Sequence, residues 1–427
     1  MNKKVEILAM GIDLANDYTQ IAVIDNPDSN ESKGIPASRG NTDCLIRSVL
    51  YISREGTWHI GDDAVKRAEM DGGECAEDIV NIMLSGGELQ YNGSVYSAYE
   101  LMRGYLNACI EHVRFLYVDI SIKEICITAV DNPKVFTDNA YKALGTLGFL
   151  KENIRVISHS EAFIYYTCAQ RREIWVNDVC LMDFTKDNFT FYILTTKRNS
   201  NPKVINVELT DYTQMFNIEK LSDPKEAEKY DVKLYNVILE KFRKRVFSTV
   251  FLTGRGFNAF SWPEQSMEEL LNKRHVFKGY NLFVKGAVIA ADKHNKTERN
   301  EFLFECPGRT KVDVGIFIMH DNKNMNLTLS KAGTNWHEAG ATVECILDDI
   351  NRFTVVITDP VSMFNRNISI VLPTFPGRPN KATRVRIALA YTDDTNMVIR
   401  VDDMGFGEFF KPSGVNLVKN INVSQLF

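Results

Sequence analysis

The chain of 427 residues is long enough to form two or three domains with buried cores. Its formal net charge of −5 and its dispersed Lys and Arg residues give no basic surface, so we expect no nucleic-acid partner. No apolar run has the length of a membrane span, and the first residues do not resemble a secretory leader. We therefore expect a cytoplasmic protein without a membrane partner.

The chain begins with a predicted β-hairpin whose pattern occurs twice. Residues 10–26, MGIDLANDYTQIAVIDN, contain a hydrophobic run that ends at Asp13, a polar tip with Asp17, and a second hydrophobic run. Residues 181–197, LMDFTKDNFTFYILTTK, repeat this pattern with Asp183 and Asp187. The repetition predicts a duplicated fold with one such hairpin in each half.

Strand-like and helix-like stretches alternate through residues 1–295, which is typical of an α/β architecture. The hydrophobic periodicity predicts a strand at 123–130, and within 250–257 a strand that runs into a glycine loop. It also predicts helices at 95–118, 132–149, 231–247 and 282–294, and a short strand followed by a helix within 153–172.

The sequence changes character after about residue 295, at the polar stretch DKHNKTERNE, residues 292–301. Residues 301–427 consist of short strand-like runs separated by turns. In RVRIALAY, the apolar residues Val385, Ile387, Leu389 and Tyr391 occupy every second position, the pattern of a strand with one buried face. These residues predict a β-sandwich-like domain.

The repeated hairpin resembles a phosphate-binding motif. A hairpin tip can present backbone N–H groups to phosphates, and an Asp at its base can hold Mg²⁺ through water. This layout resembles the actin-like ATPase superfamily of actin, sugar kinases and DnaK-type chaperones. GIDLANDYTQIAV and LMDFTKDNFTFYIL are similar to its two phosphate motifs, VFLTGRGFNAF to its adenosine motif, and RVISHSEAFIYY and NLFVKGAVIAADK to its two connecting helices. The resemblance implies a two-lobed actin-like (ribonuclease H-like) fold for residues 1–295.

Within that superfamily, the DnaK-type chaperone branch is the most similar. Residues 368–407, from ISIVLP to DDMGFG, resemble the second half of its peptide-binding β-domain, and WHIGDDAVKRA resembles a stretch after its first strands. The resemblance implies that residues 301–427 bind a protein or peptide partner. Residues 411–427 are too short for the helical lid of such a chaperone, so we expect a partner held without a lid.

The resemblance also implies a set of site residues. Asp13 and Asp183 would hold Mg²⁺ through water, and Asp183 with Glu161 or His159 would be the catalytic groups. His159 stands where the family has a glutamate. ATP would lie against the two hairpin tips and the adenosine loop, which comprise Ala15, Asn16, Asp17, Tyr18, Thr185, Lys186, Asp187, Asn188, Gly254, Arg255 and Gly256.

Each of these residues also has a structural interpretation. Asp13 and Asp183 could be turn-forming acids, and Lys186 a solvated tip residue. Gly254 could serve only a tight turn, as could its neighbour Gly256. His159 could be packed or hydrogen-bonded within the core.

The sequence departs from the family at the positions that contact phosphate. The family has glycines at both tips, because a Cβ blocks close approach of backbone to phosphate, whereas this chain has none there. Asp17 and Asp187 would each add repulsion of about 1 to 4 kcal/mol. Residues 74–90 contain no Lys or Arg to serve as the catalytic lysine, and the lobe that covers adenine is reduced.

These departures favour a DnaK-like protein with a weak or inactive ATPase domain that acts as a protein-interaction or chaperone-like module. ATP and Mg²⁺ are expected as cofactors only if the site is functional. The alternative is an active ATP-dependent chaperone with unusual phosphate tips, in which Lys186 steadies the γ-phosphate. A third hypothesis is a sugar kinase. It would need a sugar site between the two lobes, and a β-rich domain appended after the last helix does not indicate one.

Overall fold

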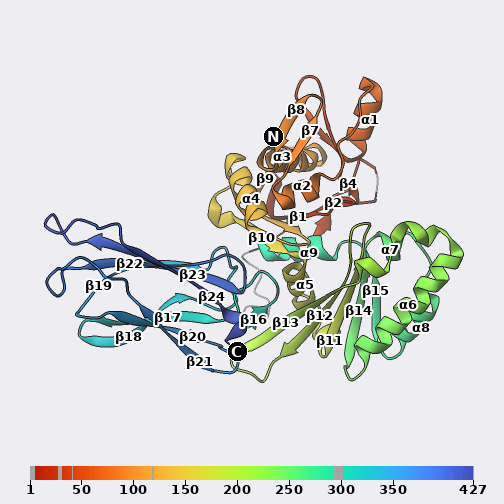
Figure 1. Ribbon diagram of the computed structural model, residues 1–427. Coiled ribbons are helices and arrows are strands. Elements are labelled where there is room, and N and C mark those ends of the chain that lie inside the picture. Colours follow the sequence, from red (N-terminus) through yellow and green to blue (C-terminus); the bar gives the residue numbers. More distant parts are fainter. Residues whose placement is uncertain (1–4, 27–30, 41, 118–119, 293–301, 427) are drawn as a thin grey trace. The chain divides into compact units, whose positions relative to one another are not determined.

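The computed structural model describes residues 5–26, 31–40, 42–117, 120–292 and 302–426, and it has a mixed α/β region followed by a β-rich region (Figure 1). The stretch proposed above as the domain boundary, residues 292–301, lies almost entirely outside the described residues. Chain contacts divide the protein into two compact units. The first comprises Met1–Thr196 and Asn206–Asn300, and the second comprises Lys197–Ile205 and Glu301–Phe427.

The first unit consists of two halves with the same order of elements, except at one helix. The first half contains β1 (Val5–Leu14), β2 (Tyr18–Ile24), β3 (Lys33–Gly34), α3 (Ala98–Leu116), β9 (Ile120–Ala129), α4 (Lys134–Thr146), β10 (Ile154–Ser158) and α5 (His159–Cys168). The second half contains β11 (Asp178–Phe184), β12 (Phe189–Lys197), β13 (Lys203–Asp211), α6 (Pro224–Phe242), β14 (Phe247–Thr253), α7 (Arg255–Asn258), α8 (Glu264–Leu271), β15 (His275–Lys278) and α9 (Leu282–Ala291). The second half thus has two helices, α7 and α8, where the first has α4.

The two sheets of the first unit share one topology. Their strand orders are β10-β9-β1-β2-β3 and β15-β14-β11-β12-β13, so that strands numbered within each half run 5-4-1-2-3. In each sheet the first two strands form an antiparallel hairpin, and the first and fourth strands are parallel. The repeated hairpin of the sequence therefore belongs to a repeated sheet.

The first half carries an insertion between β3 and α3 that the second half lacks. It contains β4 (Ile46–Arg47), β5 (Leu50–Ile52), β6 (Trp58–Ile60), α1 (Gly61–Asp71), α2 (Ile79–Ser85), β7 (Glu88–Tyr91) and β8 (Ser94–Ser97). α3 starts where Ser97 and Glu100 form a reciprocal capping box, which satisfies two of the free N–H groups at the helix start.

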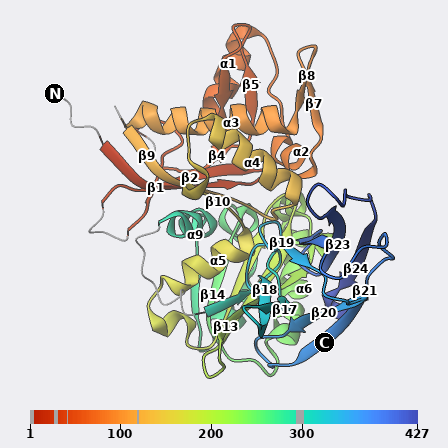
Figure 2. The same cartoon turned by 90° about the vertical axis from the view of Figure 1, so that its left-hand side faces the viewer.

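Helices α5 and α9 lie between the two sheets (Figures 1 and 2). Their close approach depends on glycine, because a Cβ on Gly286 of α9 would lie 2.0 Å from the carbonyl oxygen of Ala162 on α5. A Cβ on Gly11 of β1 would likewise lie 2.6 Å from the backbone nitrogen of Val288. These close backbone contacts set the positions of α5 and α9 relative to each other and to β1.

The largest difference between a predicted helix and the structure is at α6. The sequence pattern predicted a helix at 231–247, whereas α6 spans Pro224–Phe242. Asp223 caps its start by accepting a hydrogen bond from Lys225 N, and Pro224 occupies the first turn, where a missing N–H costs nothing.

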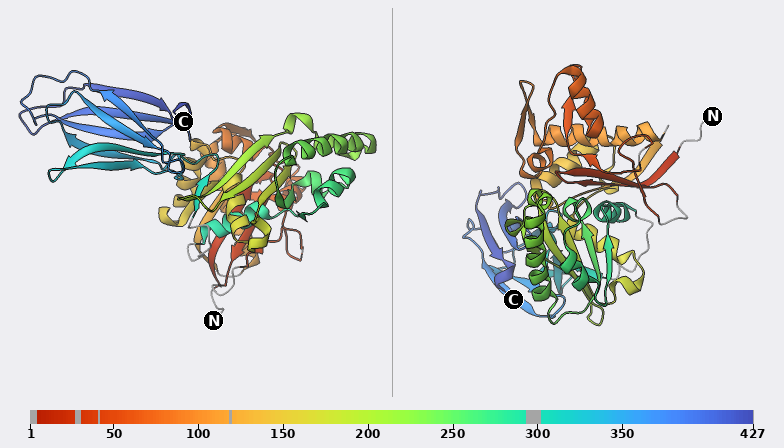
Figure 3. Two further views of the ribbon diagram at one scale, coloured as in Figure 1. Left: turned by 90° about the horizontal axis from the view of Figure 1, so that it is seen from below. Right: turned by 90° about the vertical axis from the view of Figure 1, so that its right-hand side faces the viewer.

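The second unit contains two antiparallel sheets, seen as two layers in the left view of Figure 3. Their orders are β18-β17-β20-β21 and β19-β22-β23-β24. Val385, Ile387, Leu389 and Tyr391 are all buried, which confirms the predicted alternation. The strands of these two sheets are β17 (Asp313–His320), β18 (Lys323–Ser330), β19 (Gly340–Ile346), β20 (Arg352–Thr358), β21 (Asn365–Val371), β22 (Arg384–Tyr391), β23 (Asn396–Gly405) and β24 (Asn416–Asn422). A further strand, β16 (Phe302–Glu305), precedes them in the chain.

Both sheets of the second unit contribute to a single hydrophobic core, which includes Val355 and Ile357 of one sheet and Ile399 and Val401 of the other. No helix in the described part of the chain is both long enough and apolar enough to cross a membrane.

Candidate functional site

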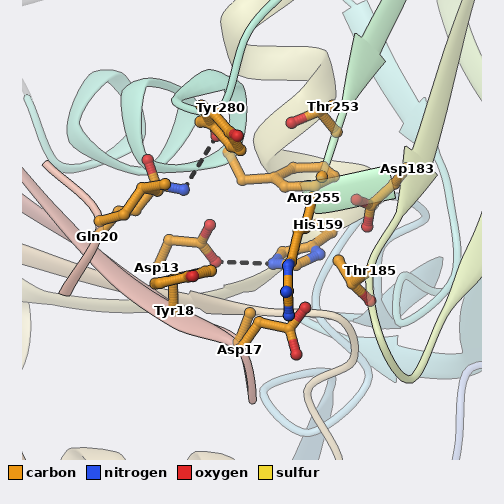
Figure 4. Close-up of a pocket in the computed structure, with 14 residues that line it drawn as sticks. Asp13, Asp17, Tyr18, Gln20, His159, Asp183, Thr185, Thr253, Arg255 and Tyr280 are labelled. Carbon is orange, nitrogen blue, oxygen red and sulfur yellow. Dashed lines mark hydrogen bonds and ion pairs between the residues drawn. The ribbon is translucent and has the colours of Figure 1, made fainter. Parts of the chain in front are cut away.

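The two repeated hairpins converge on a small pocket in the first unit (Figure 4). The β1–β2 and β11–β12 tips, the start of α5 and the loop after β14 form its walls, and its volume is about 40 Å³. Nine residues predicted from the sequence line it: Asp13, Ala15, Asp17, Tyr18, His159, Asp183, Thr185, Gly254 and Arg255.

Asp13 and Asp183 occupy equivalent positions in the two sheets. Asp13 on β1 pairs with Gln20 of β2 and lies beside Thr128 of β9. Asp183 on β11 lies in the same way beside Thr253 of β14. Both carboxylates are 3% exposed. The duplicated topology therefore brings two buried acids to one pocket.

His159 lies between these two acids as the first residue of α5. Its Nε2 is 2.8 Å from Oδ1 of Asp13, and its ring stacks on Phe283 of α9 with centroids 3.8 Å apart. Its Nδ1 is buried and has no hydrogen-bond partner among the described residues. Hydrogen bonding and stacking thus account for the position of His159 without a reacting substrate.

The pocket raises the pKa of two of its carboxyl groups. Burial raises the pKa of Asp183 to about 6, and the nearby Asp13 adds to this effect, while His159 and the Asn188 amide oppose it. The Asn188 Nδ2 donates to Asp183 Oδ2 at 3.1 Å. Burial also raises the pKa of Asp17. Both groups consequently hold protons more tightly than exposed aspartates do.

The tips of the two hairpins hydrogen-bond to each other. The backbone N–H of Lys186 donates to Asp17 Oδ2 at 3.0 Å, and Asn16 Nδ2 donates to Asp187 Oδ2 at 2.9 Å. Arg255 extends toward Asp17 and attracts it electrostatically (Figure 4). Polar groups that a ligand would otherwise meet are therefore already bound within the protein.

The remaining tip residues support this arrangement. Thr185 N donates to the Asn188 carbonyl at 2.8 Å, which closes the second tip as a tight turn. The Ala15 carbonyl accepts a hydrogen bond from Ser48 Oγ at 2.5 Å. Four predicted tip residues are not among those that line the pocket: Asn16, Lys186, Asp187 and Asn188. Asn16, Lys186 and Asp187 lie at the contact between the tips, whereas Asn188 bonds within its own hairpin, to Asp183.

The glycines of the predicted adenosine loop pack against the protein. Gly254 has a φ of 85°, and a Cβ there would lie 2.3 Å from the carbonyl oxygen of Phe184. A Cβ on Gly256 would lie 2.3 Å from the Phe184 ring. Both glycines thus have a structural reason to be present, namely the close contact of this loop with β11.

Glu161 does not reach the pocket. It is 2% exposed and is absent from the lining residues. Successive residues of a helix are about 100° apart, so Glu161 lies roughly opposite to His159 around α5. Among the described residues, no group of three or more His, Cys, Asp or Glu side chains is arranged to hold a metal ion.

Sequence reasoning missed five lining residues: Gln20, Leu45, Thr253, Tyr280 and Phe283. Two of them carried a signal, since Thr253 directly precedes the glycine loop and Gln20 is the cross-strand partner of Asp13. Gln20 Nε2 donates to the Tyr280 carbonyl at 3.0 Å, which no sequence pattern indicated.

The fold and the pocket together define a duplicated α/β protein in which equivalent hairpins bring two buried carboxylates together. The chain belongs to the family described as "Family of unknown function (DUF5716) C-terminal", which matches residues 31–307. Residues 309–423 match a "Domain of unknown function (DUF8552)". No curated protein matches the chain.

Proposed function

We propose that the first unit is an actin-like, two-lobed domain of the DnaK type whose nucleotide site has become degenerate, and that the β-rich unit is a protein-interaction module. Two features support the assignment of the fold. The 5-4-1-2-3 strand order occurs twice, and each half ends in a helix, α5 or α9, that packs against the other. A duplicated sheet with paired helices is the architecture that the sequence resemblance implied.

The observation that carries the functional proposal is the contact between the hairpin tips. In a working phosphate site, backbone N–H groups point at the phosphate oxygens. Here the Lys186 N–H donates a hydrogen bond to the Asp17 carboxylate at 3.0 Å. A carboxylate of this chain thus takes the position of an anionic ligand, and an incoming phosphate would have to displace it.

The size of the pocket supports the same conclusion. A volume of about 40 Å³ has room for about three water molecules. Pockets that bind drug-sized ligands have volumes of roughly 300–1,000 Å³. ATP would therefore require the tips to separate and two hydrogen bonds between them to break.

The β-rich unit has side chains suited to a partner. Phe409 is 94% exposed, and Met319, Met363 and Phe317 are each more than half exposed. Aromatic and Met side chains are enriched in protein interfaces. This supports a protein or peptide partner for residues 301–427, held without nucleotide-driven release.

Calorimetric titration of ATP with Mg²⁺ tests the proposal. Micromolar affinity corresponds to about 8 kcal/mol, and we expect the wild-type protein to show no binding in that range. A double variant, Asp17→Gly with Asp187→Gly, removes both tip carboxylates and restores the residue type that phosphate tips require. We expect it to bind ATP more tightly than the wild type does.

The alternative is an active ATPase in which Asp13 and Asp183 organise Mg²⁺. It predicts the opposite pattern: micromolar ATP binding and steady turnover in the wild type, both abolished by Asp183→Ala. That result would overturn the proposal of a degenerate site.

A further inference from the structure

A second and much larger hollow lies in the first half of the first unit, away from the carboxylate pocket. It has a volume of about 910 Å³, and its walls come from the inserted segment and from one face of α3. Figure 2 shows that α1 and the β7–β8 hairpin project from the side of the sheet that carries α3. We call this hollow the α1–α3 groove.

The α1–α3 groove is elongated. Arg103, Asn107, Glu111 and Phe115 all line it, and they follow one another at intervals of four residues along α3. At 1.5 Å per residue, this stripe is about 18 Å long. An extended peptide of about five or six residues has the same length. The dimensions therefore suit a segment of chain better than a compact ligand.

The floor of the groove is formed by Trp58 of β6. A Cβ on Gly104 would lie 2.5 Å from its indole ring, so only glycine allows the ring to lie on α3 at this point. The ring also meets Tyr96 edge-on at 5.7 Å. Trp58 is half-buried and thus offers a fixed apolar surface to a bound side chain.

The acidic side chains of the groove have cationic partners within the protein. Asp62 pairs with Arg47 at 3.5 Å, and Glu111 pairs with Arg114. Asp63 lies 2.6 Å from His59 and also pairs with Arg67. These contacts leave little negative charge free to attract a cationic partner.

Among the described residues, three cationic side chains of the groove, Lys66, Arg103 and Arg39, do not pair with acidic side chains of the groove. Lys66 of α1 and Arg103 of α3 are exposed and form no ion pair within the described part of the chain. Arg39 is held at the far end, over the Phe115 ring at 4.4 Å and against the Phe115 carbonyl at 2.9 Å, so its partners there are neutral. The charge that remains available in the groove is positive.

We propose that the α1–α3 groove binds an acidic peptide segment of a partner protein. Carboxylates of the segment would pair with Lys66, Arg103 and Arg39, and an apolar side chain would rest on Trp58. A nucleic acid fits less well, because its closely spaced phosphates would need more cations than Lys66, Arg103 and Arg39 supply. This inference does not depend on the proposed state of the nucleotide site.

The test measures the fluorescence anisotropy of a fluorescein-labelled peptide of about six residues, rich in Glu with one Leu, as the full-length protein is added. We expect saturable binding that weakens as salt is added. The double variant Lys66→Glu with Arg103→Glu should bind at least about tenfold more weakly. Asn107→Trp fills the middle of the groove without changing charge and should also weaken binding.

A matched control reverses two exposed lysines in the other half, Lys220→Glu with Lys225→Glu, and so changes the net charge equally. We expect it to bind like the wild type, and circular dichroism checks that every variant is folded. The proposal is overturned if the wild type binds no acidic peptide, if the control loses as much affinity as the groove variant, or if both groove variants bind normally. Tighter binding of a single-stranded oligonucleotide of similar length would also overturn it.

Discussion

Replacing Asp183 by Asn should stabilise the protein at neutral pH. The Asp183 carboxyl group is 3% exposed and accepts one hydrogen bond, from Asn188 at 3.1 Å. Burial raises its pKa from an ordinary 3.8 to about 6. The folded protein therefore carries the ionised form at a cost, and a neutral amide of the same shape removes that cost while keeping an acceptor for Asn188.

The magnitude follows from the linkage between proton binding and folding. Because the folded state binds the Asp183 proton more tightly than the unfolded state does, the stability contributed by this group falls as pH rises from about 4 to 6. Each tenfold change in proton affinity corresponds to about 1.4 kcal/mol. The rise of the Asp183 pKa from 3.8 to about 6 therefore corresponds to a gain in the free energy of unfolding of at most roughly 3 kcal/mol for Asp183→Asn. The full gain is expected above about pH 6, and no gain is expected below about pH 4.

Urea denaturation of the wild type and Asp183→Asn at neutral and acidic pH measures this gain. The matched control is Asp13→Asn at the equivalent position of the first sheet. Asp13 accepts a hydrogen bond from His159 at 2.8 Å, and a neutral amide would keep only a weaker acceptor, so we expect this replacement to destabilise by about 0.5 to 1.5 kcal/mol. Equal stability of Asp183→Asn and the wild type at both pH values, or a loss at neutral pH, would refute the reasoning.

Three further predictions concern packing and polar contacts. Asp403→Asn should lower the free energy of unfolding by about 3 to 5 kcal/mol, because it breaks a buried bidentate pair with Arg378. The pairing lowers the pKa of Asp403, so this loss of stability should shrink in strong acid, and chemical denaturation at neutral and low pH measures it. Gly286→Ala should lower the melting temperature through a clash with the Ala162 backbone of about 1 to 3 kcal/mol or more, and an unchanged melting temperature would contradict the described helix contact. Asn16→Ala should speed amide hydrogen exchange at both hairpin tips, whereas unchanged exchange would mean that the tips are held by other contacts.

The sequence alone predicted the features that depend on neighbours along the chain. The repeated pattern around Asp13 and Asp183 located both hairpins, because hydrophobic alternation and a polar tip are local signals. The alternation in RVRIALAY identified the buried face of β22 for the same reason. The start of α6 also has a local signal, the capping Asp223 followed by Pro224. The prediction relied on hydrophobic periodicity instead and placed the start seven residues too late, at residue 231.

Only the tertiary structure decided how the two hairpin tips meet. Asn16 and Asp187 are 171 residues apart in the chain, and their hydrogen bond exists because two separate sheets bring their tips together. The sequence predicted that Asp17 and Asp187 would repel a phosphate, but not that they would accept hydrogen bonds from the opposite tip. Such pairings depend on the packing of α5 against α9, which sets the distance between the halves and which no single segment encodes.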